Sequence, residues 1–300
     1  MIEITDLTKT FGASQVLDGV SLEVQRGRVY GLVGPNGAGK TTLIKIMMGF
    51  LLPTGGRVFI DGQDVHQHPR IKSQVGYVAD YQNYYPGFSV NDMVRFYRGT
   101  FENWNEERFA ELRRVFDLPD KRTFKNFSKG MRTQLALLLN LSLMPNVLIL
   151  DEPTSGLDPV LRRQVLGMLV DEVARNGTTV FVATHNLNEL ERTCDQIGMI
   201  HQGRILFDEN LEDMKQKVRK IQVAFADGLP PELAKRPDVL KVEQQGRVYG
   251  IVMRENSAEM LAELKKHDPL LLETIDMSLE DIFIYRMGGL GYEFSDIIAQ

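Results

Sequence analysis

The chain has 300 residues, of which 43% are hydrophobic and 25% are charged, a composition typical of a globular protein. This length allows one large domain or a domain with a smaller companion, and the net charge of −5 argues against nucleic acid as the main partner. Cys194 is the only cysteine, so an internal disulfide is excluded, as fits a reducing cytoplasm.

The sequence predicts neither a signal peptide nor a membrane-spanning helix. The first residues, MIEITDLTKTF, carry acidic side chains and no apolar core, so we expect no signal peptide. The most apolar stretch, residues 134–150, contains Asn140, Pro145 and Asn146 and is shorter than the ~20 apolar residues of a spanning helix. We expect a buried helix, a turn and a core strand there. If the protein works at a membrane, another chain must supply the spans.

Strands and helices follow in a recognisable order through the first 214 residues. Residues 1–30 alternate apolar and polar positions and predict antiparallel strands, and a second strand pair lies around residues 55–65. Helical periodicity prevails from about 85 to 143, which we interpret as a helical subdomain. Strands and helices then alternate to about residue 210, as in a mixed sheet with helices on both faces.

The pattern changes near Lys215. KIQVAF and GRVYGIVM alternate with period two, SAEMLAELKKH has helical periodicity, and LLETIDMS returns as a strand. We therefore predict an α/β cassette over 1–214, a small α+β C-terminal domain over 215–287 and a Gly-rich tail over 288–300.

A glycine-rich loop follows the apolar strand RVYGLVG and precedes the helical segment KTTLIKIMMGF. Its sequence, GPNGAGKTT, matches the P-loop pattern, in which backbone N–H groups surround phosphate oxygens. Lys40 would reach the β- and γ-phosphates, and the Thr41 hydroxyl would bind Mg²⁺. The expected nucleotide-binding residues are Gly34, Pro35, Asn36, Gly37, Ala38, Gly39, Lys40, Thr41 and Thr42.

Two carboxylates end the apolar strand VLILDE. Asp151 would hold the Mg²⁺ ion, while Glu152, on the other side of the strand tip, could activate a water molecule. His185 ends another apolar strand, FVATH, and parallel strands present their carboxyl ends to one crevice. We therefore expect His185 to contact the γ-phosphate.

A second candidate anion site lies in NFSKGMRTQ, residues 126–134. Ser128 is a suitable helix N-cap, Gly130 permits close approach of another group, and free N–H groups beside Lys129 attract an anion. A single nucleotide does not explain why one chain carries two such sites.

The order P-loop, FSKGM, LILDEPTSGLD, ATH resembles the ATP-binding subunit of an ABC transporter over residues 1 to about 210. In that family two cassettes pack head to tail, with ATP between the P-loop of one and the signature motif of the other. The resemblance implies a homodimer or paired cassette, in which Ser128, Lys129 and Gly130 contact the partner's nucleotide. It also implies that Phe11 stacks on adenine, although the sequence alone favours a buried core position, and that Asp158 lies along the dimer seam. Permease chains would engage the helical subdomain near the aromatic segment YQNYYPGF.

Two residues differ from those usual in the family. Asp80 stands where a Gln generally touches Mg²⁺, and Lys129 replaces a Gly of the signature motif, with Phe127 and Met131 also altered. We expect Asp80 to act as a metal ligand, with turnover slower than in a typical importer. The C-terminal segment, ending MSLEDIFIYRM, is similar to that of bacterial cassettes that export drugs, antibiotics or lipid-linked cargo.

We therefore expect a Mg²⁺-dependent ATPase subunit on the cytoplasmic face of the membrane, coupling ATP-driven dimer closure to export by separate permease subunits. One alternative is an ATP-binding regulatory cassette with weak hydrolysis, which Asp80 and Lys129 favour and Lys40, Asp151 and Glu152 oppose. The other is a soluble ABC ATPase that acts on ribosomes or DNA. A single acidic cassette without a long coiled coil argues against it.

Overall fold

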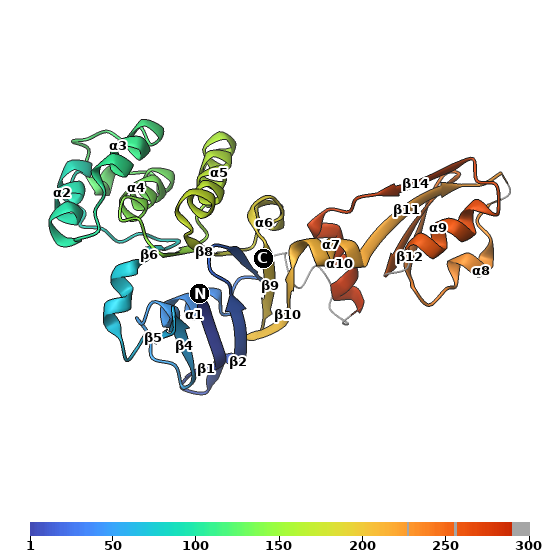
Figure 1. Ribbon diagram of the computed structural model, residues 1–300, viewed down its shortest axis with the longest axis horizontal. Helices are drawn as coiled ribbons and strands as arrows, with labels where there is room; N and C mark the ends of the chain where they lie inside the picture. The colour runs from blue at the N-terminus through green and yellow to red at the C-terminus, as the bar shows by residue number, and fades with distance from the viewer. Residues whose placement is uncertain (227, 255–256, 290–300) are drawn as a thin grey trace. The chain divides into compact units, whose positions relative to one another are not determined.

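The computed structural model describes residues 1–226, 228–254 and 257–289 and divides the chain into two compact units (Figure 1). The first unit is Met1–Asp208, and the second begins at Glu209. This division precedes the boundary expected after residue 214, because the helix α7, Leu211–Lys217, belongs to the second unit. Of the predicted tail, residues 290–300 lie outside the described residues.

An antiparallel sheet opens the first unit, in the order β2-β1-β4-β5. In β1 every second residue is buried from Ile2 to Ile4, and a register shift before Leu7 returns that side chain to the buried face. The predicted N-terminal strands are thus confirmed, with an irregularity that periodicity did not indicate. The strands are β1 Ile2–Phe11, β2 Ser14–Val24, β4 Gly55–Ile60 and β5 Gln63–Asp64.

A six-stranded sheet, β10-β9-β3-β8-β7-β6, forms the centre of the first unit. Within it, the pairs β6–β7, β7–β8, β3–β8 and β3–β9 are all parallel. All residues of β3, β7 and β8 are buried, as expected for strands covered on both faces. The strands are β3 Val29–Val33, β6 Val75–Val78, β7 Val147–Asp151, β8 Thr179–Thr184, β9 Gln196–His201 and β10 Arg204–Asn210.

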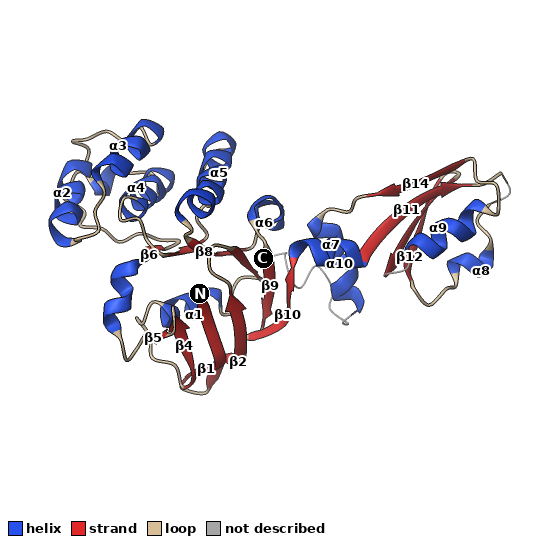
Figure 2. Cartoon of the chain, in the orientation of Figure 1, coloured by secondary structure: helices blue, strands red, loops and turns tan. Residues whose placement is uncertain are grey.

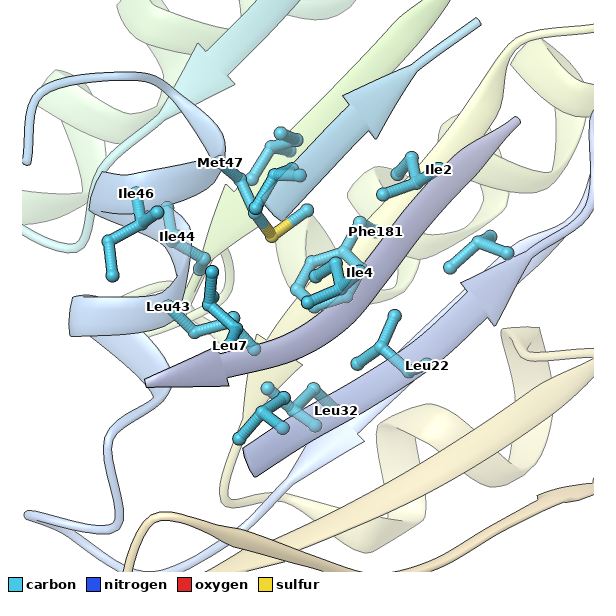
Figure 3. Packing of buried hydrophobic residues seen from close by; sticks show 14 of the residues in the cluster. Ile2, Ile4, Leu7, Leu22, Leu32, Leu43, Ile44, Ile46, Met47 and Phe181 are labelled. Carbon is cyan, nitrogen blue, oxygen red and sulfur yellow. The ribbon is translucent and has the colours of Figure 1, made fainter. Parts of the chain in front are cut away.

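The main hydrophobic core joins these two sheets to the helix α1, Lys40–Met47. Figure 3 shows Ile4 of β1 and Phe181 of β8 in the same cluster as Leu43 and Met47 of α1. All four side chains are at most 2% exposed. Because α1 is packed from both sides, the loop that precedes it is held at a fixed place above the sheet.

Three helices of the predicted helical subdomain lie together in Figure 2, and the longest packs against the edge strand β6. Each begins at a capping side chain: Ser89 forms a capping box, Asn105 accepts from Arg108 N, and Ser128 accepts from Met131 N. The helices are α2 Val90–Thr100, α3 Glu106–Val115 and α4 Lys129–Leu141, with short 3₁₀ turns at Pro69–Gln74 and Phe124–Asn126.

Two further helices complete the first unit. The helix α5, Pro159–Asn176, begins at Asp158, whose carboxylate accepts hydrogen bonds from Val160 N and Leu161 N. The helix α6, Leu187–Thr193, follows β8 directly. The loops after β3, β6, β7 and β8 therefore leave the same edge of the parallel sheet, which is where such folds bind ligands.

The second unit has its own antiparallel sheet, β12-β13-β11-β14, and its own core. Ile221, Ile251 and Met253 from the sheet pack with Met260 and Leu264 of α9. The predicted α+β character is confirmed. The elements are β11 Val218–Ala224, α8 Pro231–Ala234, β12 Val239–Gln245, β13 Val248–Arg254, α9 Ser257–Lys265, β14 Leu271–Ile275 and α10 Leu279–Gly289.

A buried ion pair joins α3 to α5, and we expect its loss to destabilise the first unit. Glu172 is 0% exposed and pairs with Arg108, and its second oxygen accepts from Asn176 Nδ2 at 2.6 Å. Glu172→Ala leaves the Arg108 guanidinium without this partner and should lower the free energy of unfolding by about 3 kcal/mol in urea denaturation. Asp171→Ala is the control, because its exposed pair with Arg175 spans 3.9 Å. Equal losses from both variants would contradict the expectation.

Candidate nucleotide site

A cavity of about 270 Å³ lies at the carboxyl edge of the parallel sheet. The P-loop forms most of its wall, and the rest comes from Val16 of β2, Asp80 after β6, and Asp151 and Glu152 at the end of β7. Its charged and hydroxyl side chains are Lys40, Thr41, Thr42, Asp80, Asp151 and Glu152. One cation, two hydroxyls and three carboxylates thus converge on a single space.

The glycines of the P-loop are required by its path. Gly39 has φ 109°, and a Cβ there would lie 2.8 Å from a Leu17 side-chain carbon. A Cβ at Gly34 would lie 2.3 Å from the Ile200 carbonyl oxygen. Gly39 offers no side chain to cap α1, so the first N–H groups of this helix are available to an anion in the cavity.

Lys40 is 7% exposed, and its ammonium donates to the carbonyl oxygens of Gly34 and Pro35. Burial lowers the pKa of Lys40, and the nearby Glu152 and Asp151 oppose that shift. The Lys40 ammonium therefore binds the carbonyl oxygens at the start of the P-loop and lies near the carboxylates of Glu152 and Asp151.

Thr41 and Asp151 meet directly, because the Thr41 hydroxyl donates to Asp151 Oδ2 at 2.8 Å. Burial raises the pKa of Asp151, the Thr41 hydrogen bond opposes the rise, and the charges of Glu152 and Asp80 add to it. A hydroxyl and a carboxylate oxygen are ligands that Mg²⁺ accepts, and a divalent ion would relieve this crowding of negative charge. Within the described residues no group of three or more His, Cys, Asp or Glu could hold an ion alone. Such a site suits Mg²⁺, which usually keeps water and phosphate ligands.

Glu152 faces a different partner from its neighbour Asp151. Its backbone φ is 49°, and its carboxylate accepts from the Thr184 hydroxyl at 3.1 Å. His185 Nδ1 lies 2.9 Å from Glu152 Oε1, with the imidazole 60% exposed and Glu152 14% exposed. The two carboxylates thus separate as the sequence indicated, one toward the P-loop threonine and one toward the end of β8.

The signature segment does not line this cavity. Among the described residues that form the wall, none comes from Ser128 to Gly130. Ser128 caps α4 at the surface, and Gly130 packs so closely that a Cβ there would lie 3.1 Å from the Gly156 carbonyl oxygen. Lys129 instead contacts Asp80, with 2.6 Å between its Nζ and Asp80 Oδ1.

Phe11 ends β1 with 46% of the residue exposed, so the buried core position that the sequence alone favoured is wrong. The Lys9 ammonium lies 4.8 Å from its ring centroid. Phe11 is not in the cavity wall, which Val16 reaches from the same hairpin.

A buried hydrogen bond that could not be predicted from the sequence links two loops of the site. The Thr154 hydroxyl donates to Glu189 Oε2 at 2.6 Å, and Asn186 Nδ2 donates to Glu189 Oε1 at 2.9 Å. Burial raises the pKa of Glu189, and the hydrogen bond from Thr154 opposes that shift. Glu189 therefore ties the loop after Glu152 to the helix after His185, a link that no sequence motif signals.

Comparison with known proteins identifies the fold and the family. A family model described as "ABC transporter" matches residues 17–155. The lantibiotic transport ATP-binding protein SrtF of Streptococcus pyogenes is 33% identical, over 71% of this chain and 95% of its own length. The chain belongs to the ATP-binding subunits of ABC transporters.

Further similarity extends this assignment beyond the cassette core. The ABC transporter ATP-binding protein YtrB of Bacillus subtilis is 29% identical over 96% of this chain and 99% of its own length, so the similarity reaches into the second unit. A solved ATP-binding subunit of an ABC transporter covers 72% of this chain with a TM-score of 0.66 and 29% identity. The cassette is therefore an ABC-type ATPase that binds ATP. In the part of the chain that the structure describes, no helix is both long and apolar enough for a membrane span.

Proposed function

We propose that two copies of this cassette hydrolyse ATP at sites shared between them and thereby drive export through separate permease chains. ABC cassettes dimerise and work with membrane permease subunits. The observation that carries the proposal for this chain is that neither Ser128 nor Gly130 lines the P-loop cavity. A partner copy could bring that second anion site to the nucleotide.

Four side chains of the cavity then have defined parts. Lys40 and the free N–H groups of α1 hold the phosphates, and Thr41 and Asp151 hold Mg²⁺. The metal would neutralise negative charge as the bond to the γ-phosphate breaks. Glu152 accepts a proton from the attacking water, and ATP and water become ADP and phosphate. His185 lies against Glu152 and contacts the γ-phosphate from the end of β8.

The partner chain would add Ser128 and Gly130 to the same phosphate. Ser128 is exposed and begins a helix of 13 residues, whose N-terminal N–H groups attract anions. ATP would then join the two copies, and its hydrolysis would release them. Closure and opening of the pair supply the movement that a permease can use.

The permease would dock on the helical subdomain, with the pair at the cytoplasmic face of the membrane. Tyr85 and Phe96 of this subdomain are 59% and 43% exposed, and Tyr81, in the segment that leads into it, is 64% exposed. Large exposed aromatic side chains are characteristic of protein interfaces. The names of relatives include lantibiotic and bacitracin transport, so we place the cargo among antibiotic-like compounds and the direction as export.

Co-purification and turnover test this function together. The full chain, expressed together with a multi-span membrane protein found by searching the neighbouring genes, should co-purify with that protein in detergent and hydrolyse ATP. With a non-hydrolysable ATP analogue, small-angle scattering should show the mass of two chains. A regulatory cassette, which the altered residues Asp80 and Lys129 favour, would bind ATP and co-purify but show negligible turnover. A monomer that turns over ATP at the same rate at all concentrations would overturn the shared site.

A further inference from the structure

The folded chain brings together the two residues that depart most from the family pattern. Lys129 Nζ donates to Asp80 Oδ1 at 2.6 Å and to Ser155 Oγ at 2.8 Å. Asp80 places a carboxylate where the family generally has a neutral amide, and Lys129 places a cation where it usually has a glycine. One change adds a negative charge to the nucleotide cavity, and the other adds a positive charge beside it.

The Lys129 ammonium is held in place by the structure around its stem. Lys129 is the first residue of α4, and its stem crosses Gly156, where a Cβ would lie 3.2 Å from Lys129 Cδ. Gly156 has φ 77°, a conformation that side chains other than glycine rarely adopt. The Ser155 hydroxyl supplies a second acceptor beside Asp80. The turn after β7 thus positions the ammonium toward the cavity of its own chain.

Asp80 lies where its charge matters for phosphate. It lines the cavity together with Asp151 and Glu152, where Lys40 is the cation that lines the same wall. A polyphosphate entering this space meets three carboxylates, and repulsion between like charges within one cavity is large enough to change affinity. Both partners of the Lys129–Asp80 pair are about half exposed, so the pair itself adds little to folding stability. The main effect of the Lys129–Asp80 pair is therefore to change the net charge at the cavity.

We propose that Lys129 is a positioning residue that neutralises Asp80 within its own chain, so that the two departures from the family pattern compensate each other. The proposal rests on ATP binding at this cavity and goes beyond it. It assigns Lys129 to the nucleotide of its own chain, whereas the family pattern placed residue 129 on the nucleotide of the partner. It also accounts for how a carboxylate at residue 80 is compatible with phosphate binding.

Equilibrium binding of ATP in EDTA, at protein concentrations where the chain is monomeric, tests the proposal without metal or partner. Lys129→Ala should weaken ATP binding about tenfold, because Asp80 is left unneutralised. Asp80→Asn should bind at least as tightly as the unaltered chain. The double variant, Lys129→Ala with Asp80→Asn, should return to within about threefold of the unaltered chain.

Controls separate this effect from folding and from general loss of charge. Lys125→Ala removes an exposed lysine four residues earlier and should leave ATP affinity unchanged. The thermal unfolding midpoint should differ little among the variants, because the Lys129–Asp80 pair is about half exposed and adds little to stability. Inorganic triphosphate should repeat the pattern, because the repulsion acts on phosphate and not on the base.

Two results would overturn the inference while leaving the proposed function intact. In the first, the Lys129→Ala monomer binds ATP like the unaltered chain but fails to dimerise, and adding Asp80→Asn does not restore dimerisation. Lys129 would then contact the nucleotide of the partner. In the second, the double variant is as weak as Lys129→Ala. If the unaltered chain binds no ATP, the proposed function fails, and this inference fails with it.

Discussion

Lys40→Ala should abolish ATP binding at micromolar nucleotide, with a loss of about 100-fold or more. Lys40 is the lysine in the cavity wall, and its ammonium is buried. Losing two charge-assisted hydrogen bonds from this ammonium to phosphate would cost about 3 kcal/mol of binding free energy. Alanine also removes the hydrogen bonds to Gly34 and Pro35 that hold the loop closed. Titration of a fluorescent ATP analogue measures the change.

Lys45→Ala is the matched control for this prediction. Lys45 lies in the last turn of the same helix, and its side chain is exposed. It should bind ATP like the unaltered chain, and circular dichroism should show that both variants are folded. Affinity of Lys40→Ala within threefold of that control would show that the P-loop cavity is not the phosphate site.

Glu152→Gln should bind ATP normally but lower turnover by about 100-fold to 10,000-fold. An amide is nearly isosteric with the carboxylate but cannot accept the proton of the attacking water, and general bases contribute this range. Because ATP then persists between the two copies, the variant should form a stable dimer on addition of Mg²⁺ and ATP. Phosphate release measures the rate, and light scattering during gel filtration measures the mass.

Glu3→Gln provides the comparison, since Glu3 is an exposed residue of β1 outside the cavity wall. Its turnover and its monomer–dimer equilibrium should match those of the unaltered chain. If Glu152→Gln turns over ATP at the normal rate, another group activates the water. If Glu152→Gln loses turnover but stays monomeric with ATP, the sandwich of two cassettes is contradicted, whereas the assignment of Glu152 as the general base stands.

Local signals in the sequence determined much of this site. The P-loop was predictable because close packing and positive φ angles demand glycine at defined places, such as Gly39 before α1. The N-cap at Ser128 was predictable because a side-chain oxygen meets N–H groups within one turn. The separate directions of Asp151 and Glu152 follow from adjacency at the end of a buried strand. Each of these features is signalled by residues within a few positions of one another, even where its contacts lie far along the chain.

Only the tertiary structure decided which distant charges meet. Lys129 and Asp80 are 49 residues apart, and Arg108 and Glu172 are 64 apart. The sheet order β3-β8-β7-β6 differs from the order along the chain, so the loops that share a cavity cannot be paired from the sequence alone. Phe11 shows the same limit, because its exposure depends on what packs over the end of β1. The sequence determines the local shape of each loop, and the sheet topology determines its neighbours.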